Sequence, residues 1–326
     1  MDTAADYFPD HTPAETQKVR RKARVKIGHN RSRLLHSIEK LENGDEGERL
    51  RQQLEYLTGR RVAALMASEI GGGNGVLPVA WAAGMGLPLA DADGMGRAFP
   101  EVPQVTMQLA GIPASPAVIT DERGNLIVFQ TISSDWMERL ERAAAVEFGG
   151  AASSTEFSLT AAEARTATIH GSVSLAIRIG AAVTGAAGDP VAALIAEIGA
   201  YRLVGGKVSD VMRQTRSGFV RGAVIVEGLN ADAGRLIRLE LQNENLVALE
   251  RGKVLASVPD LITVLDTETA DAIATEQIRY GQRVTVIAFP CDPVWRTDRG
   301  IAATGPRTFG YDFDYVPVEE LAGVTT

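Results

Sequence analysis

Cysteine is almost absent from this sequence of 326 residues, which contains a single one, Cys291. One thiol excludes an internal disulfide and zinc sites built from several thiolates. Long apolar runs are missing too: the longest, residues 76–92, is interrupted by prolines and Asp91, and none reaches the ~20 apolar residues that span a bilayer. The acidic opening, MDTAADYFPDH, lacks the apolar centre of a secretory signal. We expect a protein outside the membrane, in a reducing, cytoplasmic setting.

The sequence has no basic excess, because 33 Lys and Arg residues stand against 41 Asp and Glu residues, for a formal net charge of -8. General nucleic-acid binding needs a basic surface, so we expect no nucleic-acid partner. Basic residues do crowd positions 18–33, inside an atypical segment at 1–35. This segment is either a basic arm for an acidic partner or RNA, or a solvated helix or disordered tail, and we favour the second interpretation.

Length and composition indicate two domains. A chain of 326 residues exceeds one average domain, and 45% hydrophobic with 23% charged residues is ordinary for a protein with a real core. The small-residue stretch GGAASST at 149–155 reads as a linker. After the basic segment, we therefore predict an N-terminal domain at 36–155 and a C-terminal domain at 156–326.

The first of these domains alternates strand and helix patterns. RRVAALMASEI at 60–70 reads as a buried strand, residues 77–86 as a helix opened by Pro78, and LPLADADG at 87–94 as a second strand. Further strands are predicted at 104–109, 116–120 and 126–130, followed by a helix at 134–148 capped by Ser134. This rhythm favours an α/β layer with a mostly parallel or mixed sheet, in which sites gather beyond the carboxyl ends of the strands.

The second half begins with helical patterns and then changes to β. Helices are predicted at 159–167, 172–183 and 190–201. From Gly206 onward, short β-rich runs alternate with Gly, Asn and Asp, and the clearest lie at 224–228, 235–250, 253–258, 261–266 and 283–289. We predict a mixed C-terminal domain with a β-rich core of the sandwich or barrel kind.

A glycine-rich segment, EIGGGNG, follows the first predicted strand. Glu69 and Asn74 bracket three glycines, among them Gly72 and Gly73, which let the backbone approach a ligand closely. The spacing matches neither phosphate-loop signature, because no Lys-Ser or Lys-Thr follows and no G-x-G-x-x-G opens a helix. The favoured interpretation is a tight turn that presents backbone N–H groups to an anion or a carbonyl.

The stretch DADGMGRAFPE, at the end of the second predicted strand, places three acids and one arginine within eleven residues. Asp91 and Asp93 would share one face of a strand, where their charges repel unless a cation intervenes. Arg97 can supply that cation in bidentate fashion. Three interpretations of these groups and Glu101 remain open: a metal site of oxygen ligands, a general base, or an ion-paired turn without chemistry.

Two polar segments of the C-terminal half are further candidates. GGKVSDVMRQTRSGFVRG, with Asp210 and Arg213, indicates either recognition of an anion or the exposed strand ends of a hairpin. We read LQNENL as one continuous strand. Gln242 and Glu244 would then lie on one face of the strand, and Asn243 and Asn245 on the other. Polar side chains inside an apolar strand need partners, which are each other, a ligand or water.

Two single residues complete the set of candidates. His170 precedes a predicted helix and is either a ligand or base, or a capping and packing residue. Cys291 lies between two prolines and beside Asp292, whose charge disfavours a thiolate. An inert thiol is the favoured interpretation, with a nucleophile as the alternative.

Taken in order, these segments and three later ones resemble the S-methyl thiohydantoin desulfurase family of bacteria. The series is EIGGGNG, DADGMGRAFPE, GGKVSDV, QNEN, VPDLI, TEQIRYGQRV and GPRTFGYDFDY, which runs from about Ser37 to Pro317 without large gaps. The resemblance implies an α/β N-terminal domain, a C-terminal domain with β structure, and companions of the hydantoinase and oxoprolinase kind. It also implies hydrolysis of a hydantoin-like five-membered ring, described in the family as cysteine-dependent.

The sequence departs from the family at two places. Members often carry other small residues at the position of Cys291. They usually begin with a glycine-rich strand and loop of the kind GTGGGG, and nothing similar precedes Glu69 here. If that loop forms a wall of the pocket, we expect a catalytically impaired member with exposed backbone and apolar surface.

Our first hypothesis is therefore a hydrolase of a small hydantoin-like or thiohydantoin-like substrate, with homo-oligomers expected. The candidate catalytic residues are Asp91, Asp93, Glu101 and Cys291, with either of the first two as acid or base. The candidate substrate-binding residues are Glu69, Gly72, Gly73, Asn74, Arg97, His170, Asp210, Arg213, Asn243 and Glu244. The alternative is a non-catalytic member that binds a small ligand or a hydantoinase-type partner subunit. The sequence identifies no cofactor and leaves a metal open.

Overall fold

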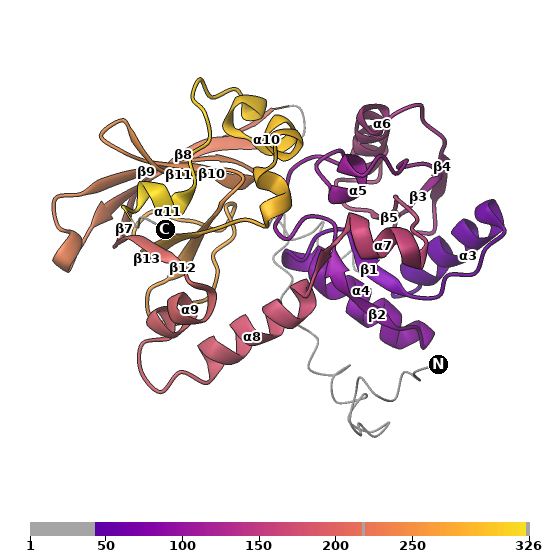
Figure 1. Ribbon diagram of the computed structural model, residues 1–326, viewed down its shortest axis with the longest axis horizontal. Coiled ribbons are helices and arrows are strands. Elements are labelled where there is room, and N and C mark those ends of the chain that lie inside the picture. The colour runs from indigo at the N-terminus through magenta and orange to yellow at the C-terminus, as the bar shows by residue number, and fades with distance from the viewer. Residues whose placement is uncertain (1–42, 217–218, 324–326) are drawn as a thin grey trace.

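The computed structural model describes residues 43–216 and 219–323, so the basic segment predicted at 1–35 lies outside the described residues. Two parts stand side by side in Figure 1: an N-terminal part of helices around small sheets, and a C-terminal part built on one large sheet. The predicted fold class, an α/β layer followed by a mixed domain with a β-rich core, is confirmed.

The longer helices are α3 (Glu46–Thr58), α4 (Gly72–Met85), α6 (Ser134–Glu147), α8 (Ser172–Thr184) and α9 (Pro190–Ile198). The short ones are α5 (Thr106–Leu109), α7 (Ala161–Ala167), α10 (Asp298–Thr304), α11 (Val318–Leu321) and the 3₁₀ turns η2 (Asn230–Asp232), η3 (Pro293–Arg296) and η4 (Pro306–Phe309). The strands are β1 (Leu65–Ala67), β2 (Leu89–Asp93), β3 (Ala117–Thr120), β4 (Leu126–Phe129), β5 (Ser153–Thr155), β6 (Ile169–His170), β7 (Tyr201–Arg216), β8 (Phe219–Gly228), β9 (Leu236–Gln242), β10 (Glu244–Glu250), β11 (Lys253–Ser257), β12 (Leu261–Asp266) and β13 (Arg283–Phe289).

The N-terminal part contains two three-stranded sheets, ordered β1-β2-β6 and β4-β3-β5. β1 and β2 are parallel, with Ala67 opposite Asp93, and β6 runs antiparallel to β2. The sheet is therefore mixed, as expected. Because parallel strands end at the same edge, the residues that follow β1 and β2 are brought together.

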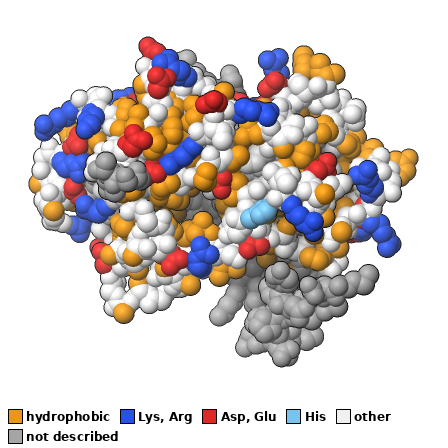
Figure 2. All heavy atoms as spheres, viewed as in Figure 1, with side chains coloured by type: hydrophobic (Ala, Val, Ile, Leu, Met, Phe, Trp, Pro, Cys, Tyr) orange, Lys and Arg blue, Asp and Glu red, His pale blue; other side chains and the backbone are white. Residues whose placement is uncertain are grey.

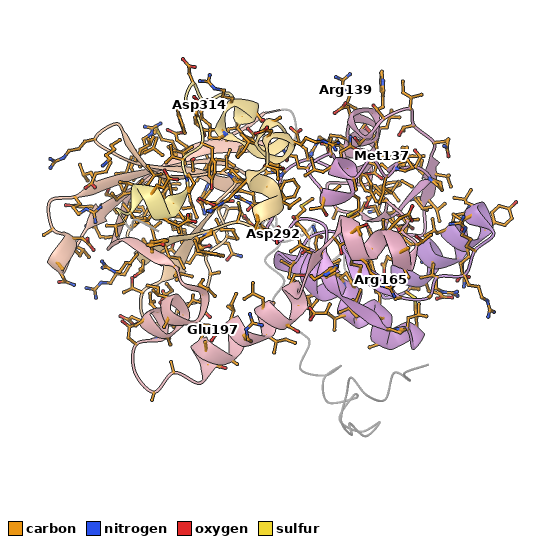
Figure 3. The ribbon with its side chains drawn as sticks, viewed as in Figure 1. Met137, Arg139, Arg165, Glu197, Asp292 and Asp314 are labelled. Atoms are coloured by element: carbon orange, nitrogen blue, oxygen red, sulfur yellow. The ribbon has the colours of Figure 1, made fainter. Side chains whose placement is uncertain are left out.

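Helix α6 shows how the core of this part forms. Ser133, rather than the predicted Ser134, caps it by accepting a hydrogen bond from the backbone of Trp136. Met137 is fully buried, whereas Arg139, two positions later, is exposed on the opposite side of the helix (Figure 3). Burying a side chain of this size contributes about 1.5–3 kcal/mol to the free energy of unfolding.

The C-terminal part is one antiparallel sheet of seven strands, ordered β11-β10-β9-β8-β7-β13-β12. The sheet curves into a half-barrel, and its two ends approach each other: Asn245 Nδ2, on β10, donates to the carbonyl oxygen of Ile262, on the end strand β12, at 3.2 Å. Its apolar interior is fully buried at residues such as Val224. This core supplies a rigid frame for the loops that face the N-terminal part.

The two parts are joined by α8, which runs between them in Figure 1. The side chain of Asp91 on β2 accepts hydrogen bonds from the backbone N–H of Ser174, at 3.0 Å, and from its hydroxyl, at 2.5 Å. Gly171, the residue at the N-cap, has no side chain to do this. Asp91 therefore caps α8 from the neighbouring strand.

Several predicted elements differ from the structure. Where a strand was predicted at 104–109, residues Thr106–Leu109 form the short helix α5, and the carbonyls of Gly94 and Ala167 hold the Thr106 hydroxyl. The predicted strand at 235–250 is two strands, since the chain reverses at Asn243, whose φ is +57°. Strand β7 begins at residue 201, before the expected change to β at Gly206.

Helix α4 also begins earlier than predicted, at Gly72 rather than near Pro78, which lies inside the helix. Glycines form the first turn of this helix, where neighbouring backbone atoms leave no room for a side chain at Gly75. A Cβ at Gly75 would lie 2.5 Å from the carbonyl oxygen of Ile70, closer than any side chain tolerates. The segment EIGGGNG thus continues from the short connection after β1 into the first turn of α4, and is not the isolated turn that we expected.

The surface of the described residues is mixed in charge. Figure 2 shows Lys and Arg side chains interspersed with Asp and Glu over the visible face, with apolar atoms between them. Each helix in the described part of the chain is too short or too polar to cross a bilayer.

Candidate functional site

The carboxyl ends of β1 and β2 meet where the N-terminal part faces the C-terminal part. Gly94 N donates to Ser68 O at 3.0 Å, so the chain segments that follow both strands stay paired. Glu69 and Asp93 lie at this edge, in agreement with the rule that places sites beyond the carboxyl ends of parallel strands.

Asp93 is fully buried and holds the backbone of both segments. Its Oδ2 accepts hydrogen bonds from the N–H groups of Ile70 at 3.0 Å, Met95 at 3.2 Å and Gly96 at 2.7 Å. Burial raises the pKa of Asp93, and these N–H groups oppose that rise. Its carboxylate fixes the turn at 94–97, which carries Arg97.

Arg97 is only 6% exposed and reaches across to the C-terminal part. Its Nη1 donates to the carbonyl oxygens of Pro259 at 2.6 Å and Asp260 at 2.9 Å, and its guanidinium lies 4.6 Å from the centroid of the Phe99 ring. Nη2 makes no hydrogen bond within the described residues. Burial lowers the pKa of Arg97, and the nearby charge of Glu244 opposes this most strongly.

Glu244 enters the site from the tip of the β9–β10 hairpin. The reversal at Asn243 makes Glu244 the first residue of β10, and the Thr275 hydroxyl donates to the carbonyl of Asn243 and fixes the tip. Burial raises the pKa of Glu244, Arg97 lowers it, and Glu276 raises it. Arg97 thus favours the ionised form of this half-buried carboxyl group.

Glu69 is the second half-buried acid of the site. Burial raises its pKa to about 8, and the charge of Glu244 adds to the rise. Asn74 Nδ2 donates to Glu69 Oε1 at 2.7 Å, which fixes one carboxyl oxygen. At neutral pH Glu69 is therefore mostly protonated. A carboxyl group whose pKa is raised toward neutrality, beside a second half-buried carboxyl group, is typical of acid–base sites.

Cys291 lies beside this site but in a different environment. Asp260, fully buried, accepts four hydrogen bonds, among them one from Cys291 N at 3.0 Å and one from Arg296 Nη2 at 2.8 Å. The thiol is 5% exposed, and burial followed by the charge of Asp260 raises its pKa to about 12. The thiolate, the reactive form, is thus scarce at neutral pH.

The other catalytic candidates lie apart from Glu69 and Glu244. Asp91 caps α8, and Ser174 lowers the pKa of its carboxyl group against the effect of burial. Glu101 faces α6, where burial and then the charge of Glu138 raise its pKa. The expected pairing of Asp91 and Asp93 through Arg97 is absent from the described residues, because the guanidinium turns toward the C-terminal part.

The remaining substrate-binding candidates are scattered. His170 is exposed, with Nε2 3.4 Å from the carbonyl oxygen of Ala164. Asp210 is exposed at a bulge of β7. Arg213 Nη2 donates to the carbonyls of Thr275 and Ile278, so it supports the loop beneath the hairpin tip. Gly72 and Gly73 lie in the first turn of α4, and Gly72 is exposed.

Sequence reasoning missed two acids that shape the site, Asp260 and Glu276. Both lie in segments that carry the family resemblance, VPDLI and TEQIRYGQRV. A signal for Asp260 was present, since an acid between apolar residues and a proline is buried only when it has partners. Groups of three or more His, Cys, Asp or Glu suited to a metal ion are not found within 43–216 and 219–323.

Two facing parts with polar groups between them define a two-domain α/β protein with a buried acid–arginine site. Residues 15–131 match the description "S-Me-THD-like, N-terminal domain", and residues 132–318 match "S-Me-THD-like, C-terminal domain". The chain therefore belongs to the S-methyl thiohydantoin desulfurase-like family.

One solved structure is similar to this chain in fold. It is an X-ray crystal structure of a protein from Chromobacterium violaceum, with 24% sequence identity and a TM-score of 0.71. The match covers 85% of this chain and 78% of that one. A search of curated proteins gives no match.

Proposed function

We propose that this protein hydrolyses an S-methylated thiohydantoin or a closely related five-membered ring, with Glu69 and Glu244 as its acid–base pair. The observation that carries the proposal is the raised pKa of Glu69, about 8, beside a second carboxyl group that Arg97 holds toward its ionised form. In this proposal Glu69 is the acid and Glu244, whose ionised form the charge of Arg97 favours, is the base, so that protons can be transferred in both directions.

The reaction has two steps in this proposal. First, water attacks the ring carbon that bears the S-methyl group. Glu244 takes one proton from the water, and Glu69 gives its proton to the adjacent ring nitrogen as the C–O bond forms. Then the C–S bond breaks as a carbonyl forms. Glu69 recovers a proton from the new hydroxyl group, and Glu244 gives its proton to the departing sulfur. The products are methanethiol and a hydantoin ring, and both acids return to their starting states.

Arg97 has two roles in this scheme. Its charge favours the ionised form of Glu244, the form that takes a proton from the attacking water. Its Nη2, which makes no hydrogen bond within the described residues, is free to bind a ring oxygen that becomes more negative in the transition state. Cys291 is assigned no covalent step, because its thiol is protonated.

The test is release of methanethiol from an S-methylated thiohydantoin by the purified chain. Glu69→Gln and Glu244→Gln should each lower turnover by roughly 10²–10⁴-fold, the usual contribution of a positioned acid or base. Glu101→Gln is the matched control, since it removes a half-buried carboxyl group of raised pKa that faces α6 instead. Turnover that is absent in the unaltered chain, or equally low in all three variants, would contradict the proposal.

A further inference from the structure

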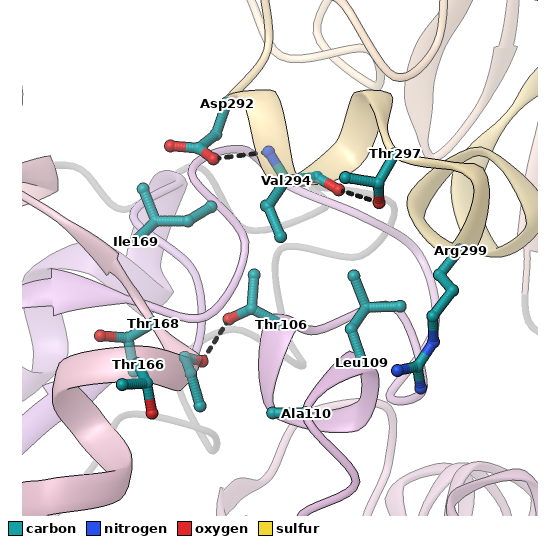
Figure 4. A pocket seen from close by; sticks show the side chains of 11 residues that line it. Thr106, Leu109, Ala110, Thr166, Thr168, Ile169, Asp292, Val294, Thr297 and Arg299 are labelled. Carbon is teal, nitrogen blue, oxygen red and sulfur yellow. Dashed lines mark hydrogen bonds between the residues drawn. The ribbon is translucent and has the colours of Figure 1, made fainter.

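A pocket of about 380 Å³ lies between the two parts of the molecule (Figure 4). Leu109 and Ile169 line it from the N-terminal part, and Val294 lines it from η3 of the C-terminal part. These three side chains point into the pocket and give it an apolar middle (Figure 4). Its volume suits a small organic ligand.

This pocket is separate from the site of Glu69 and Glu244, neither of which lines it. The turn at 94–97 stands between them. A Cβ on Gly96 would lie 3.0 Å from Cδ1 of Ile169 and 4.0 Å from Cβ of Asp292, so one side of this turn backs onto the pocket, while Arg97 extends toward Glu244.

The hydroxyl groups around the pocket are already engaged with the protein. Thr168 donates to Ala164 O at 2.6 Å, Thr297 donates to Val294 O at 2.7 Å, and Thr106 donates to Ala167 O at 2.7 Å. These threonines therefore offer mainly their methyl groups to a ligand. Polar recognition is left to the two charged residues of the lining.

Those two residues, Asp292 and Arg299, stand on opposite sides of the pocket (Figure 4). Asp292 uses one carboxyl oxygen, which accepts from Val294 N at 2.9 Å, and its other oxygen has no partner in the described chain. Arg299 is exposed and makes no ion pair with a described residue. It lies in the first turn of α10, where a helix disfavours positive charge. An anionic ligand that pairs with Arg299 would account for a positive charge at this position.

We infer that this pocket binds a small carboxylate that carries an amide or ureido N–H at the far end of an apolar chain. The carboxylate pairs with Arg299, the N–H donates to the free oxygen of Asp292, and the chain packs on Leu109, Ile169 and Val294. Bound in this way, the ligand contacts both parts of the molecule. The inference does not rest on the proposed hydrolysis.

Calorimetric titration of the full chain tests it with three probes: hexanoate with a terminal ureido group, hexanoate itself, and hexylurea. The hexanoate with a ureido group should bind at least about tenfold more tightly than hexanoate or hexylurea, because each of these two probes lacks one charge-assisted contact. Arg299→Gln and Asp292→Asn should each weaken its binding by about tenfold. The asparagine side chain can still cap η3, so that variant keeps the local fold.

Arg165→Gln is the matched control, because Arg165 is an exposed arginine at the end of α7 that does not line the pocket. It should bind the ureido acid like the unaltered chain, and so should Glu69→Gln, which separates this site from the hydrolytic one. The inference is overturned if the three probes bind equally, if none binds, or if Arg299→Gln and Arg165→Gln have the same affinity.

Discussion

Burial raises the pKa of Glu69, which follows the first strand of the N-terminal part, and the charge of Glu244, at the tip of a hairpin in the C-terminal sheet, raises it further. The two residues belong to different parts of the molecule, so this interaction between their carboxyl groups requires both parts. Arg97 holds the two halves in place, since it hydrogen-bonds the carbonyls of Pro259 and Asp260. The site therefore forms only where the N-terminal and C-terminal parts meet.

The rate of hydrolysis should fall as pH rises through about 8. In the proposed first step Glu69 must hold a proton, and its pKa is raised to about 8, mainly by burial. Turnover measured from pH 6 to pH 10 under saturating substrate should therefore show an alkaline limb with a midpoint near 8. A rate that keeps rising over this range would indicate a required base of higher pKa and would exclude Glu69 as the acid.

Replacing Cys291 by serine should leave turnover within about threefold of the unaltered chain. With a thiol pKa of about 12, only about one molecule in 10⁵ carries the thiolate at pH 7. Iodoacetamide should likewise fail to inactivate the folded protein, because the thiol is also buried. Loss of activity by a hundredfold or more in Cys291→Ser, with an unchanged melting temperature, would restore the cysteine as nucleophile.

Asp93→Asn should lower stability more clearly than turnover. One oxygen of Asp93 accepts three backbone N–H bonds, and an amide oxygen accepts them more weakly, at a cost of about 1–2 kcal/mol in the free energy of unfolding. Since Asp93 positions the turn of Arg97 and transfers no proton, turnover should fall by less than about tenfold. Abolished turnover with full stability in denaturant titration would instead make Asp93 the acid or base.

The sequence located half of the site because one rule of α/β structure needs no tertiary information. Strands were predicted at 60–70 and 87–94, with a site beyond their carboxyl ends, and the parallel pairing of β1 with β2 places Glu69 and Asp93 together there. The role of Asp93 could not be predicted in the same way. Whether a carboxylate at a strand end performs chemistry or binds backbone N–H groups depends on the conformation of residues 94–97, which only the fold determines.

The other half of the site depends on contacts that are remote in sequence. LQNENL was predicted as part of one continuous strand, whereas the chain reverses at Asn243, whose φ is positive, and forms a hairpin tip. Glu244 then points toward Arg97 because the two parts pack together. Similarly, 104–109 has the composition of a strand, but Thr106–Leu109 form a helix, with the Thr106 hydroxyl held by the carbonyls of Gly94 and Ala167.

A second pair of carboxyl groups, Glu141 and Glu156, should make stability fall as pH rises. Glu141 lies on the buried face of α6, and burial followed by the charge of Glu156 raises its pKa. The folded state therefore holds this proton more tightly than the unfolded state. Its contribution is fully present below about pH 4.5, the ordinary glutamate value, and is lost as pH rises toward the folded-state pKa.

Glu141→Gln should consequently flatten the pH dependence of the free energy of unfolding. The difference in this free energy between the variant and the unaltered chain should shift in favour of the variant by roughly 1–3 kcal/mol from pH 5 to pH 8. Urea titrations at both pH values measure this. Glu147→Gln is the control, since Glu147 is exposed on the same helix. If the free energy of unfolding depends on pH in the same way in both variants, the buried pair does not bind a proton more tightly in the folded state.

The most direct measurement is a carbon NMR titration of the Glu69 carboxyl group, assigned by comparison with Glu69→Gln. Its midpoint should lie near pH 8 in the unaltered chain and move to lower pH in Glu244→Gln, because removing the neighbouring negative charge lowers the pKa of Glu69. A midpoint near the ordinary value of 4.5, or one that the Glu244 substitution leaves in place, would contradict a coupled acid–base pair between the two parts.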